Sequence, residues 1–268
     1  MPQGSGDFVF IDPQINPEMP ITVWTYKPKG AGPDVPVVFV MHGASRNGDD
    51  YRDAWIEYAD RYRFVVIAPE FARPYYPKAW GYNLGNMFRD GREEIPESQW
   101  AFTAVEAIFG RVVKENQLSA QDYRIYGHSA GAQFVHRMVL FKPDARIKRA
   151  VAANAGWYTL PQYDVHFPYG LRGSGFDQHG LARVFSKDLI VLLGTSDNDP
   201  YHRSLRRTSE AMAQGSHRFE RGQTFFAEAE RAAVRNGLRL SWRVEFVPGV
   251  GHSNRGMSPA AAELLSGP

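Results

Sequence analysis

The chain has 268 residues, of which 43% are hydrophobic and 22% are charged, and its formal net charge at pH 7 is +2. These values are typical of a globular protein, and so small a charge does not indicate a nucleic acid or a membrane surface as a partner. The sequence contains no cysteine, which excludes disulfides, a thiol nucleophile and thiolate metal ligands.

The sequence contains no apolar run of about 18 residues, so we expect no membrane span. Residues 1–7 lack the basic and apolar segments of a signal peptide, which favours a cytoplasmic protein. The alternative is a secreted protein from which a signal has been removed. Nothing in the sequence indicates the oligomeric state.

The N-terminal part of the chain predicts the first strands of a sheet. Segments 8–11 and 21–27 are rich in β-formers and are separated by Asp-Pro and Asn-Pro pairs, which favours a hairpin-like edge. The continuous apolar segments 35–41 and 64–68 predict strands covered on both faces. Between them, residues 52–62 predict a helix with an apolar face.

From there on, strands and helices are predicted to alternate. Four further strands are expected at 122–126, 147–153, 189–193 and 240–247. Four further helices are expected at 100–115, 132–140, 223–236 and 259–265. This alternation predicts a single α/β domain, residues 1–268, with a doubly wound, mostly parallel, eight-stranded sheet and helices on both faces.

Two long stretches, 70–96 and 156–186, show no periodicity and are rich in aromatic residues. Loops of this length inside a compact domain are usually functional, so we expect them to form the rim or lid of a pocket. Their rings, with Trp157 and Tyr158 as candidate substrate contacts, suggest an apolar or aromatic substrate group. The alternative is that most of these rings pack the loops onto the sheet.

Residues 127–131 form a G-x-S-x-G pentapeptide between a predicted strand and a predicted helix. This is the pattern of a sharp turn that presents a serine above the end of a sheet. The flanking glycines suit it because side chains there would collide with the neighbouring strand and helix. Ser129 is therefore the candidate nucleophile. The alternative is a strand-to-helix turn with a buried structural serine.

A serine nucleophile requires a base and an orienting carboxylate. His252 follows the last predicted strand in a glycine-rich loop and is the candidate base. Asp197 follows the strand 189–193 and is the candidate acid, with Asp199 as the alternative. The order Ser129, Asp197, His252 is the order expected when the serine lies on such a turn.

The other histidines have no assigned catalytic role. His128 is expected to pack within the turn, His136 to lie on the polar face of the following helix, and His202 to be solvated in a basic loop. No histidine pair has the i, i+4 spacing of a helical zinc site, so we expect no metal.

The negative charge of a tetrahedral intermediate requires two preorganised donors. One is expected to be the N–H of Ala130, which directly follows the serine. The other is expected on the turn that begins at residues 42–43, with the N–H of Ala44 as first choice. Ser45 is the second choice and also a candidate substrate contact.

Residues 201–222 are expected to form a basic, polar loop, and its residues Arg203, Arg206 and Arg207 are open to two interpretations. These side chains are either a solvated surface or a site that favours an anionic substrate.

Residues 42–44, 127–131, 194–197 and 251–252 together make the chain resemble the α/β-hydrolase superfamily. The resemblance spans residues 20 to 265. Within the superfamily, residues 41–43 and 247–252 are similar to the group of polyhydroxybutyrate depolymerases and feruloyl esterases.

The resemblance implies an α/β-hydrolase fold and serine ester hydrolysis through an acyl-enzyme, without a cofactor. The substrate is expected to be a small-molecule or polymeric ester, of aromatic, short-chain or polyester type. A peptidase or amidase with the same triad is one alternative. A non-catalytic binding protein on this fold is the other.

Overall fold

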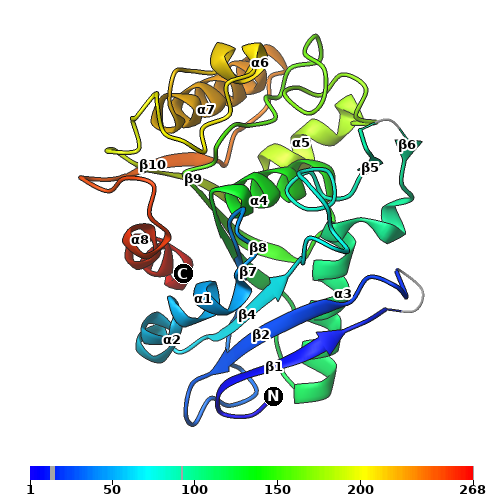
Figure 1. Cartoon of the computed structure of the whole chain (residues 1–268), viewed down its shortest axis with the longest axis vertical. Helices are drawn as coiled ribbons and strands as arrows, with labels where there is room; N and C mark the ends of the chain where they lie inside the picture. The colour runs from blue at the N-terminus through cyan, green and yellow to red at the C-terminus, as the bar shows by residue number, and fades with distance from the viewer. Residues whose placement is uncertain (13–15, 92, 268) are drawn as a thin grey trace.

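The computed structural model describes residues 1–12, 16–91 and 93–267. At its centre is an eight-stranded sheet (Figure 1). In chain order, its strands are β1 (Gly4–Phe10), β2 (Ile21–Lys27), β3 (Val37–Met41), β4 (Val65–Glu70), β7 (Tyr123–His128), β8 (Ile147–Ala153), β9 (Leu189–Gly194) and β10 (Arg243–Val247). Across the sheet their order is β1-β2-β4-β3-β7-β8-β9-β10.

The sheet is mostly parallel, as the alternation of strands and helices predicts. β1 pairs antiparallel with β2, and β2 with β4, whereas all the other pairs are parallel. The inner strands β3 and β9 are buried along their whole length because helices cover both of their faces. Parallel strands end at a common edge, so the loops that leave β3, β7, β9 and β10 gather there.

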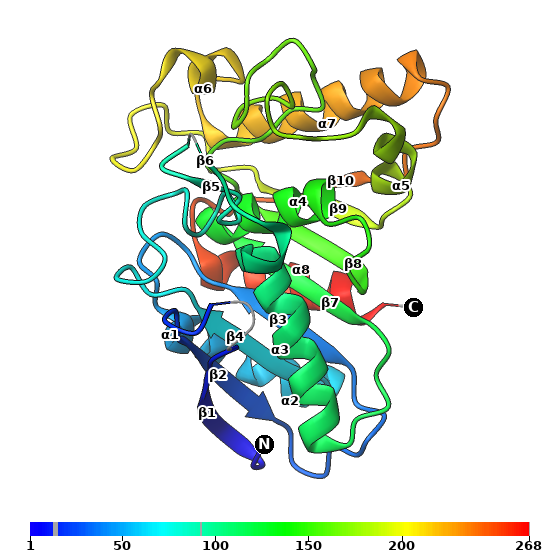
Figure 2. The ribbon, with the colours of Figure 1, turned by 90° about the vertical axis from the view of Figure 1, so that its right-hand side faces the viewer.

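Helices cover the sheet on two sides (Figure 2). One side carries α1 (Gly48–Asp53), α2 (Ile56–Tyr62) and α8 (Asn254–Ser266). The other carries α3 (Ala101–Asn116), α4 (Ala130–Phe141), α5 (Leu181–Phe185) and α7 (Arg218–Arg235). A hydrophobic core lies on each face of the sheet, and successive residues of β3 point to opposite faces. Val38 packs in the core under α1 and α8, and Phe39 packs in the core under α3 and α4.

Three of the predicted helices begin more than two residues away from where they were expected. The helix expected at 52–62 is two helices, α1 and α2, separated at residues 54–55. The helix expected at 223–236 begins at Arg218, after His217, whose ring accepts the N–H of Glu220. Its first turn lies within a segment expected to be loop. The apolar pattern misses this turn because Arg218 and Arg221 occupy buried positions.

The last helix also begins earlier than expected, at Asn254 and not at residue 259. Ser253 caps it, since its hydroxyl accepts the N–H of Gly256. A short helix, α6 (Ser209–Ala213), lies in the stretch 201–222, which was expected to be loop throughout.

The two irregular stretches contain a little regular structure. Residues 70–96 include the short strands β5 (Phe88–Arg89) and β6 (Glu93–Glu94), and residue 92 lies outside the described part of the chain. The 3-10 helix η1 (Glu97–Gln99) follows them. Residues 156–186 include the 3-10 helix η2 (Gln178–Gly180) and α5.

Phe134 of α4 fixes the first irregular stretch to the core. Its ring centroid lies 5.5 Å from that of Phe71, 5.3 Å from that of Tyr82 and 4.8 Å from that of Phe102. All four side chains are fully buried. These rings therefore hold the loop that follows β4 against the helix that follows the serine turn.

Within residues 1–12, 16–91 and 93–267, no helix combines the length and the apolar character that crossing a lipid bilayer demands.

We expect Phe134→Ala to lower the free energy of unfolding by about 3–5 kcal/mol, because it removes buried area and leaves a cavity between three rings. Urea denaturation monitored by tryptophan fluorescence measures this change. The control is Val234→Ala in α7, since Val234 is 81% exposed, and it should change stability by no more than about 0.5 kcal/mol. A loss below about 1 kcal/mol at Phe134 would contradict this role.

Candidate active site

Ser129 lies on a strained turn between β7 and α4. Its backbone has φ 58° and ψ −114°, a conformation that non-glycine residues rarely adopt. A Cβ on Gly127 would lie 2.2 Å from the Gly131 carbonyl oxygen, and a Cβ on Gly131 would lie 2.1 Å from the Met41 carbonyl oxygen. Both positions therefore require glycine, as the pentapeptide indicates. The turn projects the half-buried serine from the common edge of the sheet.

The structure brings Ser129, His252 and Asp197 into one hydrogen-bonded chain. His252 Nε2 lies 3.0 Å from Ser129 Oγ, and His252 Nδ1 lies 2.7 Å from Asp197 Oδ2. The carboxylate is an acceptor, so Nδ1 carries the proton of the neutral ring and Nε2 can accept the serine proton. These are the positions that a nucleophile, a base and an orienting acid require.

Asp199, the alternative acid, is exposed and contributes to a local turn. Its Oδ1 accepts the N–H of Tyr201 at 2.8 Å, which is the Asx arrangement common at loop bends. Asp197 is 3% exposed, and its backbone N–H donates to the Gly194 carbonyl at 3.0 Å. Of the two aspartates, Asp197 is therefore the one that reaches His252.

Asn154 joins the loops that carry the acid and the base. Its Oδ1 accepts the N–H of Gly194, and its Nδ2 donates to the Gly251 carbonyl at 3.0 Å. Asn154 is buried and has φ 51°, a left-handed conformation that asparagine tolerates better than most residues. Sequence reasoning missed this residue, although an asparagine directly after β8 was a usable signal.

His128 lies beneath the candidate base and does not touch the serine oxygen. Its ring centroid is 4.7 Å from that of His252, and its Nδ1 is 3.2 Å from the Tyr51 hydroxyl. Burial, followed by the charges of His252 and Arg218, holds the pKa of His128 well below its usual value. His128 is therefore neutral at physiological pH and packs in the turn, as expected.

His136 was expected on a polar helix face, but the structure buries it completely. Every residue of α4 is buried, so the helix has no polar face. The Nδ1 of His136 donates to the Ala132 carbonyl, and its Nε2 accepts the N–H of Thr159. His136 thus connects α4 to the segment that follows β8.

The two candidate oxyanion donors lie on the wall of one cavity beside Ser129. The N–H of Ala130 belongs to the first residue of α4 and so has no acceptor within the helix. No residue of the described chain accepts a hydrogen bond from the N–H of Ala44. Both amides are therefore free to bind a ligand oxygen. Ser45 is exposed and does not line this cavity.

His42 fixes the turn that carries Ala44. Its Nδ1 donates to the Gly43 carbonyl, its Nε2 accepts the N–H of Phe71, and its own carbonyl accepts the Tyr82 hydroxyl. Burial lowers the pKa of His42 to about 3, so the ring stays neutral and keeps this pattern of hydrogen bonds.

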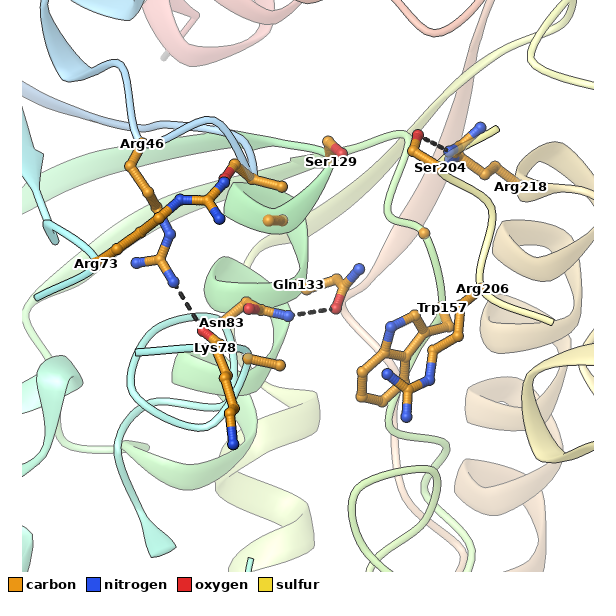
Figure 3. Close-up of a pocket in the computed structure, with 14 residues that line it drawn as sticks. Arg46, Arg73, Lys78, Asn83, Ser129, Gln133, Trp157, Ser204, Arg206 and Arg218 are labelled. Carbon is orange, nitrogen blue, oxygen red and sulfur yellow. Dashed lines mark hydrogen bonds between the residues drawn. The ribbon is translucent and has the colours of Figure 1, made fainter. Parts of the chain in front are cut away.

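The cavity in front of Ser129 has a volume of about 320 Å³ and is strongly cationic (Figure 3). Its charged lining residues are Arg46, Arg73, Lys78, Arg206 and Arg218. In the described part of the chain, no aspartate or glutamate lines it. In Figure 3, Arg46, Arg73 and Lys78 lie to one side of Ser129, and Arg206 and Arg218 lie to the other.

Two buried arginines add positive charge without a carboxylate partner in the described chain. Arg46 donates to three carbonyl groups and lies 4.3 Å from the centroid of the Tyr82 ring. Burial lowers its pKa to about 10, which leaves it charged at neutral pH. Arg137, behind the cavity, donates to Thr159, Asn83 and Gln133. The hydrogen-bond partners of both guanidinium groups are neutral and cancel no charge, and Arg137 Nη2 has no hydrogen-bond partner among the described residues.

Of the two aromatic residues expected to contact substrate, Trp157 lines the cavity and Tyr158 does not. The centroid of the Trp157 ring lies 4.2 Å from the guanidinium carbon of Arg137 and 5.0 Å from that of Arg206. Tyr158 is fully buried and stacks on Phe225, with ring centroids 4.6 Å apart. Tyr158 is therefore a core residue.

Most of the other rings of the two irregular stretches also pack inward. Phe71, Tyr76, Tyr82, Phe88 and Tyr169 are all buried. The expected aromatic pocket is therefore corrected: the lining that the structure describes contains one aromatic residue, Trp157, among cations and small residues.

Within the described residues, no group of three or more histidine, aspartate and glutamate side chains could hold a metal ion.

Two solved structures resemble the chain over nearly its whole length. A poly(aspartic acid) hydrolase-1 from Sphingomonas sp. KT-1 is 41% identical, with 99% of each chain covered and a TM-score of 0.95. A poly(3-hydroxybutyrate) depolymerase from Bordetella parapertussis is 36% identical, with 98% of this chain and 89% of that chain covered and a TM-score of 0.93.

A more distant structure shares the fold. An S-formylglutathione hydrolase from Agrobacterium tumefaciens is 18% identical, with 97% and 92% covered and a TM-score of 0.61. No protein-family model matches the chain, and no curated protein matches it.

The choice between the two aspartates is tested by comparing Asp197→Asn with Asp199→Asn. Asp197→Asn should lower kcat on 4-nitrophenyl acetate by about 10⁴-fold, because the amide no longer stabilises the histidine tautomer that accepts the serine proton. Asp199→Asn should lower it less than about threefold, since it alters only an exposed turn. Equal losses in the two variants, or the larger loss at Asp199, would exclude the assignment.

Proposed function

The chain belongs to the α/β-hydrolase superfamily, in its depolymerase-like group of serine hydrolases, and we propose that it hydrolyses carboxylic esters through an acyl-enzyme on Ser129. The observation that carries the proposal is the hydrogen-bonded chain from Ser129 Oγ through His252 to Asp197. A protein that only bound a ligand would need neither this chain nor the strained turn that presents the serine.

In the proposed reaction, Ser129 Oγ attacks the acyl carbon while His252 Nε2 takes up its proton. Asp197, which accepts the Nδ1 proton, stabilises the imidazolium that forms. The N–H groups of Ala44 and Ala130 bind the negative oxygen of the tetrahedral intermediate. His252 then donates its proton to the departing alcohol, and a water molecule releases the acyl group by the same steps in reverse.

We further propose that the natural substrate carries carboxylate groups. Five cationic side chains line the cavity, with Arg137 behind them, and no acidic side chain of the described chain faces it. Such a cavity attracts anions and holds them close to the reacting bond. The relative named as a poly(aspartic acid) hydrolase acts on a polymer with one carboxylate in each unit, which is the kind of substrate this charge suits.

A second candidate reaction is hydrolysis of amide bonds in an anionic polymer. The same relative favours it, because the units of poly(aspartic acid) are joined by amide bonds. The neutral polyester of the depolymerase relative offers no charged group to the cavity. Release of oligomers from poly(aspartic acid) but not from poly(3-hydroxybutyrate) would favour the amide reaction, and the reverse would favour a neutral polyester.

Ser129→Ala should abolish both hydrolysis of 4-nitrophenyl esters and labelling by a fluorophosphonate probe, because it removes the hydroxyl oxygen that attacks the ester and the probe. We expect at least a 10⁴-fold loss of kcat, of the size found when a triad nucleophile is removed. Thermal denaturation of the variant serves as a control for folding. Labelling of a different residue, or retained esterase activity, would contradict the proposal.

The charge preference is tested by comparing neutral 4-nitrophenyl acetate with 4-nitrophenyl succinate, whose acyl group ends in a carboxylate. We expect Lys78→Gln and Arg206→Gln to raise KM for the succinate ester about tenfold, since each removes a charge that contacts the anion. The KM for the acetate ester should change little.

Arg203→Gln is the matched control, because Arg203 is exposed on the same loop as Arg206 but does not line the cavity. Equal effects of the cavity variants on the two esters would show that the cations do not select the substrate.

A further inference from the structure

Arg218, the first residue of α7, lies against the carboxylate of the triad. Its Nη1 is 3.3 Å from Asp197 Oδ1, while His252 Nδ1 is 2.7 Å from Asp197 Oδ2. The side chains of Arg218 and Asp197 are 2% and 3% exposed. One oxygen of the carboxylate therefore faces the base and the other faces a buried cation.

The guanidinium of Arg218 also reaches the cavity. Its Nη2 donates to Ser204 Oγ at 2.9 Å, a bond drawn in Figure 3, and lies 3.3 Å from His202 Nδ1. Both Arg218 and Ser204 line the cavity in front of Ser129. Arg218 thus lies between the acid of the triad and the space that substrate would occupy.

The Asp197 carboxylate helps to keep Arg218 charged. Burial lowers the pKa of Arg218, whereas the carboxylate of Asp197 opposes this shift. Breaking such a buried pair leaves an uncompensated charge, so the two side chains hold each other in place. A carboxylate that is paired with a cation produces a weaker negative potential than a free carboxylate. It therefore stabilises a neighbouring imidazolium less.

The other titratable groups near Arg218 and Asp197 are not the source of the positive charge that faces the Asp197 carboxylate. His128 stacks beneath His252, and burial keeps its pKa well below the usual value. His202 lies 5.6 Å from His252 between ring centroids, and its pKa is lowered by burial and by Arg218. Asp199 is exposed on the loop beside them. Among the described residues, Arg218 is the cation paired with Asp197.

We propose that Arg218 is a positioning residue that sets the pH range of catalysis: it fixes the Asp197 carboxylate and takes up part of its charge, so that His252 is a weaker base than it would be beside an unpaired carboxylate. The inference rests on the proposed function, because it assumes that His252 is the base for Ser129. It extends that function by assigning to one cavity cation a part in the protonation of the triad.

The test is the pH dependence of kcat/KM on 4-nitrophenyl acetate, a neutral ester that adds no charge to the cavity. In Arg218→Gln, the carboxylate acts on His252 without an opposing cation, so the imidazole holds its proton to higher pH. The acid limb should therefore move up by about one pH unit, the order expected for one charge in a partly buried site. Arg218→Lys retains the charge and should retain the limb within about 0.3 unit, with a lower kcat.

Arg207→Gln is the matched control, since Arg207 is exposed, donates to the Pro200 carbonyl and does not touch Asp197. It removes the same charge from the same region and should leave the limb in place. A lower kcat in Arg218→Gln with an unmoved limb would show a merely structural role and overturn the inference. An equal shift in Arg218→Lys would overturn it as well.

If Arg218→Gln does not fold, Arg218→Met decides, because its unbranched apolar stem keeps much of the packing of the arginine and removes the charge. Its acid limb should also lie about one pH unit above that of the unchanged enzyme, and an unmoved limb would overturn the inference. Failure of the proposed function is distinguishable, since it would appear as full activity in Ser129→Ala.

Discussion

The close approach of Gly131 to the end of β3 is the constraint on which the site depends. The position where its Cβ would be lies 2.1 Å from the Met41 carbonyl oxygen, so only a glycine allows α4 to begin there. This contact places the first turn of α4 beside the turn of residues 42–44. The amides of Ala130 and Ala44 thereby line one cavity with Ser129. The same geometry forces the unusual backbone conformation of the serine.

Around this fixed point, each loop that carries a functional side chain has its own anchor. His42 connects the turn of Ala44 to Phe71, and Asn154 connects the loop of Asp197 to the loop of His252. Arg218 donates to Asp197 Oδ1, the carboxylate oxygen that does not face His252. These anchors are buried polar side chains whose hydrogen bonds are stronger than they would be in water. Ser129, His252 and Asp197 are therefore held together by buried contacts at the common edge of the sheet, although they lie on three separate loops.

Much of the fold could be predicted from the sequence, because its signals are local. Apolar runs of five to seven residues mark the buried strands, and the α/β-hydrolase fold with a mostly parallel eight-stranded sheet is confirmed. The order of Ser129, Asp197 and His252 follows from where each lies after a strand. The start of α7 was missed because Arg218 and Arg221 are buried, and a hydrophobic pattern cannot reveal a buried cation whose partners are distant in sequence. Composition also could not separate Trp157, which lines the cavity, from Tyr158, which packs in the core, because both are aromatic residues of the same stretch.

The cationic cavity was also beyond sequence reasoning, since its charges come from separate loops and the chain as a whole carries a net charge of only +2. The central claim is that Ser129 becomes acylated, and mass spectrometry of the enzyme quenched in acid during turnover of a 4-nitrophenyl ester tests it most directly. The account predicts a mass increase equal to the acyl group on the peptide that contains Ser129. An unmodified peptide under conditions where product forms in an initial burst, or an acyl group on another residue, would contradict it.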